Sequence, residues 1–86
     1  MMVLGDAIRV SGQPTSVAIT LDGATALVCD QHTDMVSVLD VRTPNKVAVI
    51  GVPIHVGDGP QCVAITPDGT TALVCNTWDS TVSVLT

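Results

Sequence analysis

Two polar segments of this sequence carry the side chains best suited to chemistry. The first holds Asp30, His32 and Asp34, spaced two residues apart, and the second holds Trp78 next to Asp79. Carboxylates and an imidazole are common metal ligands, but the spacing of the first segment matches no strict metal motif. We therefore expect no metal and no cofactor at these residues.

The sequence lacks the usual patterns of catalytic sites. No G-x-S-x-G elbow surrounds a serine, and the glycine-rich segment 57–60 is followed by neither a dinucleotide fingerprint nor a phosphate-loop lysine. The cysteines Cys29, Cys62 and Cys75 have no C-x-x-C spacing. We interpret them as free thiols that are buried in strands as small hydrophobic residues. The sequence thus predicts no catalytic residues and favours a protein that is not an enzyme.

Composition excludes several classes of partner. The chain has 86 residues, 47% of them hydrophobic and 13% charged, with one Trp and no Phe or Tyr. Its net charge of -5 disfavours binding to nucleic acid or to an anionic membrane. The apolar run 47–56 is shorter than the roughly 18 residues of a membrane span, and residues 1–10 lack the basic start of a signal peptide. We expect one small domain that binds no nucleic acid and inserts into no membrane.

The chain repeats itself at an offset of 46 residues. Residues 11–40 match residues 57–86 at 16 of 30 positions. The match extends to the start of the chain, where Val3, Gly5, Ile8 and Val10 recur as Val49, Gly51, Ile54 and Val56. Because every residue lies in a repeat, residues 1–86 are predicted to form a single module with no linker.

Each repeat unit is predicted to hold four short strands. In the first unit these are residues 16–20, 25–29, 35–40 and 47–52, and the turn at Asp22-Gly23 has the composition of a hairpin connection. Pro53, near the end of the fourth strand, suits an outer edge because proline offers no N–H to a neighbouring strand. Four strands per unit predict an all-β fold of β-propeller blades, each blade a four-stranded antiparallel sheet.

Three segments of the unit resemble a known family. They read Pro-x-x-Val-Ala-Ile-Thr-x-Asp-Gly, then Ala-Leu-Val-Cys before Asp or Asn, then Val-Ser-Val-Leu. They are similar to the YVTN-type β-propeller repeat of bacterial and archaeal proteins, although the naming tetrapeptide, at residues 27–30 and 73–76, lacks its Tyr. The resemblance implies prokaryotic, surface-layer-like propeller blades and a secreted or cell-surface location, whereas free cysteines favour the cytoplasm. It also leaves open a propeller enzyme of lactonase or oxidoreductase type with a site in the central channel.

The strand order predicts self-assembly. In the repeat register, residues 1–10 are an outer strand, residues 15–56 a full blade and residues 61–86 a three-stranded blade. Two blades cannot close a ring, so we expect residues 1–10 of one copy to complete the last blade of the next. A homotrimer would have six blades and a homotetramer eight, and a fragment of a larger secreted or surface-layer propeller protein is the alternative. The residues expected at this junction are Val3, Leu4, Ile8, Val10, Val82 and Val84.

Propeller geometry gathers the polar segments on one face. The loops that enter first strands and those that join second to third strands share that face, and here they are residues 11–13, 57–59, 30–34 and 76–80. We expect this face to bind a protein or small-molecule ligand, with Trp78 as an apolar platform. The alternative is a set of solvated loops with no specific ligand. The candidate binding residues are Asp30, His32, Asp34, Asp58, Trp78 and Asp79.

Overall fold

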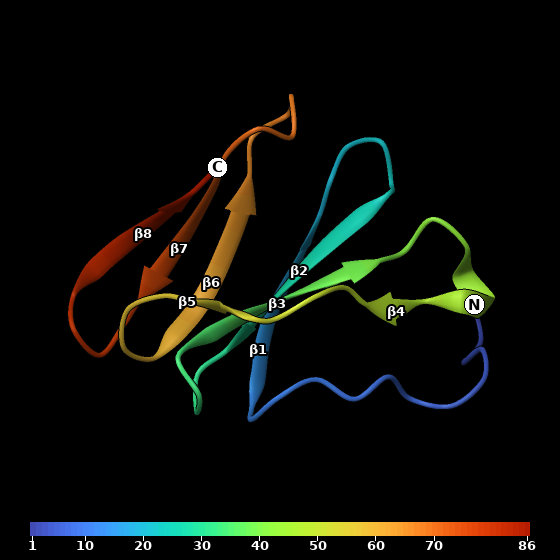
Figure 1. Cartoon of the computed structure of the whole chain (residues 1–86), viewed down its shortest axis with the longest axis horizontal. Helices are drawn as coiled ribbons and strands as arrows, with labels where there is room; N and C mark the ends of the chain where they lie inside the picture. Colours follow the sequence, from blue (N-terminus) through green and yellow to red (C-terminus); the bar gives the residue numbers. More distant parts are fainter.

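The computed structural model describes residues 1–86 as two antiparallel β-sheets, so the protein is all-β (Figure 1). The first sheet holds β1 (Pro14–Ile19), β2 (Thr25–Asp30), β3 (Met35–Asp40), β4 (Ala48–Val49) and β5 (Ile54–His55). The second holds β6 (Pro60–Ile65), β7 (Ala72–Asn76) and β8 (Thr81–Leu85). A single 3-10 turn, η1 (Pro44–Lys46), interrupts the predicted turn between the third and fourth strands. No helix is long and apolar enough to cross a membrane.

The first hairpin of each sheet closes on the same turn, as the repeat predicts. The Thr20 hydroxyl donates to Asp22 Oδ1 at 2.6 Å, and the Ala24 N–H donates to the same oxygen at 2.9 Å. Thr66 and Asp68 repeat this contact at 2.7 Å. Gly23 supplies the left-handed backbone that such a turn requires, with φ of +75°. The Asp-Gly turns predicted from the sequence are confirmed.

The fourth strand of the first sheet is not the continuous segment 47–52 that the sequence predicted. It is split into β4 and β5, which both pair with β3, through Leu39 with Val49 and Val36 with Ile54. Between them Gly51 adopts φ of +64°, which turns the chain out of the extended conformation. The predicted outer-edge position of Pro53 is confirmed, because it lies in this interruption at the sheet edge.

Residues 1–10 form no strand and pair with no strand in the single chain, so their expected role as an outer strand on a neighbouring copy stays a prediction. Their backbone nevertheless bends where the fourth strand bends. Gly5 has φ of +69°, close to the value at its repeat counterpart Gly51. The segment thus has the local shape of the interrupted fourth strand without a partner strand beside it.

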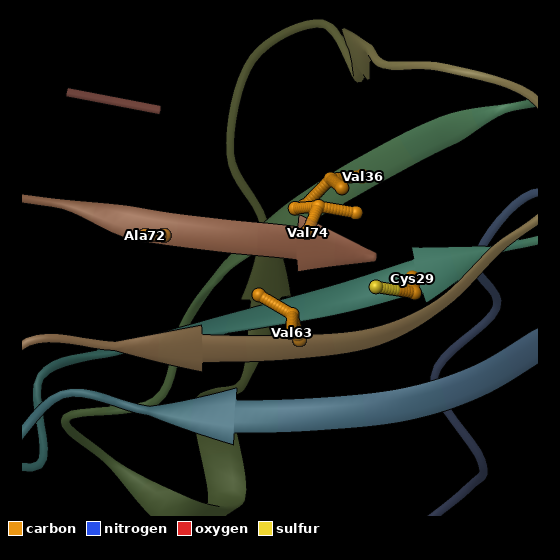
Figure 2. Close-up of a cluster of buried hydrophobic side chains, with 5 residues drawn as sticks. All are labelled: Cys29, Val36, Val63, Ala72 and Val74. Atoms are coloured by element: carbon orange, nitrogen blue, oxygen red, sulfur yellow. The ribbon is translucent and has the colours of Figure 1, made fainter. Parts of the chain in front are cut away.

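The two sheets pack through unlike faces (Figure 2). The buried cluster joins Cys29 and Val36 of the first sheet to Val63, Ala72 and Val74 of the second. Directly paired residues share a face, so the register divides each sheet into two faces. We call the face that carries Cys29 and its counterpart Cys75 the cysteine face, and the face that carries Val28 and its counterpart Val74 the valine face. The first sheet packs its cysteine face onto the valine face of the second.

Candidate functional site

Three of the predicted loops meet at one end of the molecule, in the lower part of Figure 1. They are residues 30–34 between β2 and β3, residues 57–59 before β6, and residues 76–80 between β7 and β8. The Trp78 N–H donates to the Asp58 carbonyl at 3.1 Å, and the Thr77 N–H donates to the Gly59 carbonyl at 3.0 Å. Backbone hydrogen bonds therefore fix the loop before β6 against the loop after β7.

Asp34 ties the first sheet to this loop pair. It ends the turn before β3 with φ of +60°, and its counterpart Ser80 has φ of +59°. The Gly59 N–H donates to Asp34 Oδ1 at 2.8 Å, and the Val56 N–H donates to the Asp34 carbonyl at 3.0 Å. The carboxylate thus accepts from a backbone donor 25 residues away in the chain, and its other oxygen is left for a further partner.

Asp79 holds the loop after β7 in the same way. Its Oδ2 accepts from the Asp58 N–H at 3.0 Å, and its Oδ1 accepts from the Thr81 N–H at 3.2 Å and from the Thr81 hydroxyl. The hydroxyl of Thr81, followed by the Asp58 N–H, lowers the pKa of Asp79. Hydrogen bonds to the charged form favour it, so Asp79 is an anionic acceptor and not a proton donor near neutral pH.

Trp78 is the apolar element of the site. Its side chain is 62% exposed. The indole lies against Gly59, where a Cβ would come within 2.3 Å of Trp78 Cδ2. Gly59 also has φ of +63°, so its lack of a side chain serves both the turn and the ring contact. The ring therefore packs on Gly59 while much of its surface lies in solvent.

Asp30 and His32 do not join this group, and for Asp30 the prediction of a surface ligand is wrong. Asp30 is the last residue of β2 and is fully buried, with no hydrogen-bond partner for either carboxylate oxygen. Its side chain lies under Gly12, where a Cβ would be 2.3 Å from Asp30 Oδ1, and the exposed His32 flanks the same glycine. Asp30 is buried because β2 ends at Asp30 and not at residue 29, where the polar composition predicted its end.

The prediction of buried cysteines is confirmed only for Cys29. Cys62 and Cys75 are exposed, because they lie on the cysteine face of the second sheet, which no other sheet covers. The segments that precede Cys29 and Cys75 are identical, so the sequence could not predict that one thiol is buried and the other exposed. The difference arises because a second sheet covers Cys29 and no sheet covers Cys75.

A chain of amide hydrogen bonds beside the loops was not predicted. Gln31 Nε2 donates to Gln13 Oε1 at 2.9 Å, and Gln61 Nε2 donates to Gln31 Oε1 at 3.1 Å. The hairpin register could have placed Gln13 opposite Gln31, since the neighbouring residues Pro14 and Asp30 are paired. Gln61 reaches them only through packing of the two sheets, which the sequence pattern does not specify.

The residues predicted at the assembly junction are accessible. Val82 and Val84 lie on β8, the edge strand of the second sheet, and are 57% and 61% exposed. The residues of the N-terminal segment are exposed or partly exposed, namely Val3, Leu4, Ile8 and Val10. No other strand covers either group in the single chain.

The site presents a fixed surface and no acid–base pair. The carboxylates of Asp34 and Asp79 are engaged by backbone N–H groups. None of the four hollows on the molecule is lined by Asp34, Asp58, Trp78 or Asp79. No three side chains among His, Cys, Asp and Glu are grouped to hold a metal ion. Chemically, the arrangement offers an aromatic ring beside hydrogen-bond acceptors.

Among the comparisons with known proteins, only those with solved structures found similar chains. No protein-family model matches the chain, and no curated protein sequence is similar to it. Among solved structures, hydrazine synthase of Kuenenia stuttgartiensis is 35% identical over 91% of this chain, with a TM-score of 0.77. A protein of unknown function from Desulfotomaculum acetoxidans is 19% identical over 95% of this chain, with a TM-score of 0.76. This chain spans only 22% and 29% of those two chains, respectively.

Proposed function

We propose that this chain is a non-catalytic β-propeller module that assembles head to tail into a closed ring and carries a binding surface at its loop end. Three copies would form a ring of six blades and four copies a ring of eight. One observation carries the proposal. The two sheets pack a cysteine face against a valine face, and the chain also has one outer face of each kind that no sheet covers.

The internal interface defines what each free face can accept. Inside the chain, the cysteine face of the first sheet packs on the valine face of the second, with Val36 and Val74 both fully buried. No sheet lies against the cysteine face of the second sheet or the valine face of the first. On the valine face the exposed part is the β1 side, with Val17 and Ile19, whereas Ala26, Ser37 and Leu39 are already buried. A second copy can therefore stack on the first with the same pairing of faces.

The free faces expose residues whose counterparts are buried. Val17, on the free valine face, is 59% exposed, whereas its counterpart Val63 is 6% exposed. Ile19 on the same face is 58% exposed, whereas its counterpart Ile65 is partly buried. On the free cysteine face Val82 is exposed, whereas its counterpart Val36 is fully buried. Pairing of unlike patches on the two ends of a molecule is a heterologous contact, which closes into a ring when the rotation permits.

The open edge of the second sheet supports the same assembly. β8 is an edge strand with an unpaired side, which in a soluble protein is commonly covered. Residues 1–10 match residues 47–56, which include the strands that pair with β3, at Val3, Gly5, Ile8 and Val10, and Gly5 has the same left-handed backbone as Gly51. We place this segment along β8 of the neighbouring copy, where it would complete a fourth strand by backbone hydrogen bonds.

The loop end is the part of the module suited to a ligand. Asp34, Asp58, Trp78 and Asp79 lie on it, and each assembled copy would contribute the same set to one face of the ring. An exposed indole beside carboxylate acceptors fits a partner that combines an apolar surface with hydrogen-bond donors, either a protein segment or a small molecule.

Light scattering of the full chain tests the proposed assembly. The expected mass is three or four times the chain mass of 8.8 kDa, and deletion of residues 1–10 should leave a smaller species. Ile19→Asp should also disrupt the oligomer, because it places a charge on the free valine face. Leu21→Asp is the matched control, since Leu21 lies in the adjacent turn and is already 83% exposed. A folded monomer at every concentration would refute the ring.

A second candidate rests on the comparisons. The two solved structures described above are each several times longer than this chain. The two sheets would then be consecutive units of a longer propeller, and the free faces would meet other units of the same polypeptide. A monomer that precipitates or unfolds as it is concentrated, with the Ile19→Asp variant more soluble, favours this candidate.

A further inference from the structure

Two thiols outside the loop surface face each other on the second sheet. Cys62 of β6 lies directly opposite Cys75 of β7 in the antiparallel register, and both are exposed. Residues opposite each other project from the same side of a sheet. The two sulfur atoms therefore emerge side by side on the free cysteine face.

Backbone geometry permits a covalent link between them. The Thr66 N–H donates to the Thr71 carbonyl at 2.9 Å, which marks a hydrogen-bonded pair in the β6–β7 hairpin. Such pairs recur at every second position, so Cys62 and Cys75 form another, with Cα atoms about 5.5 Å apart. Disulfides span Cα separations of roughly 4.4 to 6.8 Å. The Cβ atoms of a hydrogen-bonded pair lie about 5 to 5.5 Å apart, so they must approach by about 1 Å for a bond to form. The register shift between Pro60 and Cys62 interrupts the ladder on one side of the pair.

The third cysteine differs in reactivity. Cys29 is fully buried, and desolvation raises the pKa of its thiol to about 11. Because the thiolate is the reactive form, Cys29 stays protonated and inert near neutral pH. The exposed pair is open to a dissolved oxidant, so reaction should be confined to the second sheet.

We infer that Cys62 and Cys75 form a redox pair that switches between a dithiol and an intramolecular disulfide by exchange with a small disulfide such as oxidised glutathione. One thiolate attacks the glutathione disulfide, forms a mixed disulfide and releases one glutathione thiolate. The second thiolate attacks the protein sulfur of the mixed disulfide and expels the other glutathione thiolate. The protein loses two hydrogen atoms, and the glutathione disulfide is reduced to two thiols.

Digestion of the full chain after equilibration in a glutathione buffer tests the inference. Trypsin has no site after Lys46, so residues 47–86 hold Cys62 and Cys75 and exclude Cys29. The expected result is that this fragment loses two hydrogen atoms. Cleavage before Asp68 should then leave the pieces with Cys62 and Cys75 joined until a reductant is added.

Cys62→Ser is the matched control, because Ser16 holds the equivalent position opposite Cys29 in the first sheet. Without the resolving thiol, the glutathione adduct on Cys75 should be at least ~10-fold more abundant than in the unsubstituted protein, where the neighbouring thiol acts at a high effective concentration. Equal adduct levels in the two proteins, or a link that includes Cys29, would overturn the inference.

The inference depends on the β6–β7 hairpin and not on the proposed ring. A chain that remains monomeric while linking Cys62 to Cys75 would refute the assembly and support the redox pair. If both proposals hold, assembly should affect oxidation of the thiols, because the proposed ring covers the free cysteine face. Oxidation of the assembled form should then be slower than that of the dissociated chain.

Discussion

Val17 and Val63 occupy the same position in the two repeat units, which makes them a matched pair for testing the packing of unlike faces. Val63 is 6% exposed and packs between the sheets, whereas Val17 is 59% exposed on the free valine face. Truncating a buried valine to alanine removes about 1.6 kcal/mol of transfer free energy at ~0.8 kcal/mol per methylene. With the cavity that remains, Val63→Ala should lower the unfolding free energy by about 2 kcal/mol.

The same truncation at Val17 should have a smaller effect on the isolated chain. With 59% of the side chain already in water, the loss in unfolding free energy should stay under about 0.7 kcal/mol. On assembly, the remaining surface of Val17 would be covered, so Val17→Ala should weaken each contact between copies by about 1 kcal/mol, or roughly fivefold in affinity.

Urea denaturation and sedimentation measure the two effects separately. Trp78 is the only aromatic residue, so its fluorescence reports unfolding of the second sheet, and circular dichroism reports both sheets. Association of the two variants is then compared by sedimentation velocity. The reasoning fails if Val17→Ala destabilises the isolated chain as much as Val63→Ala does, because the two faces would then be equally covered.

Three further predictions concern single side chains. Asp30→Asn should raise the unfolding free energy by about 1–3 kcal/mol in urea melts, because it removes a buried carboxylate without partners and introduces the amide found at Asn76, and Asn76→Asp should do the reverse. The hydrogen bond from its arginine neighbour lowers the pKa of Asp40 to about 2. This folded-state pKa lies below the unfolded value of 3.8, so the stabilisation is present above pH 3.8 and is lost as the pH falls toward 2. The thermal midpoint of the Asp40→Asn variant should therefore depend less on pH across this window than that of the unsubstituted protein. Gly59→Ala should displace the indole and red-shift its fluorescence, whereas Gly23→Ala, with a similar positive φ but open space around it, should lower stability without changing the spectrum.

Local conformation was predictable wherever it follows from short-range chemistry. The Asp22-Gly23 turn, the hairpin of β1 and β2, and β3 all lie within a residue or two of the predicted ranges. These elements depend on β-branched strands and on a glycine with positive φ, which the sequence shows directly. The split of the fourth strand was missed because Gly51 was counted within an apolar run, although a glycine there can leave the extended conformation.

Burial was less predictable than conformation, and the candidate site shows why. Asp34, Asp58, Trp78 and Asp79 meet as expected, because loops at the same end of consecutive antiparallel hairpins are brought together by the strands they join. Asp30 lies only four residues from Asp34 yet is buried. Asp30 is in the interior because β2 extends by one more residue, and sequence patterns do not locate a strand end that finely.

The cysteines show that burial also depends on how the two sheets pack. Cys29 and Cys75 follow the same Ala-Leu-Val segment and have the same strand conformation, yet one is fully buried and the other exposed. A repeat specifies the backbone of each unit, whereas burial depends on the unit stacked against it. In a chain of two units, one face of each has its repeat-defined neighbour outside the two sheets. The exposure of Cys75 beside Cys62 therefore follows from the same geometry that leaves the outer faces free, and any partner that covers those faces would also control access to the thiol pair.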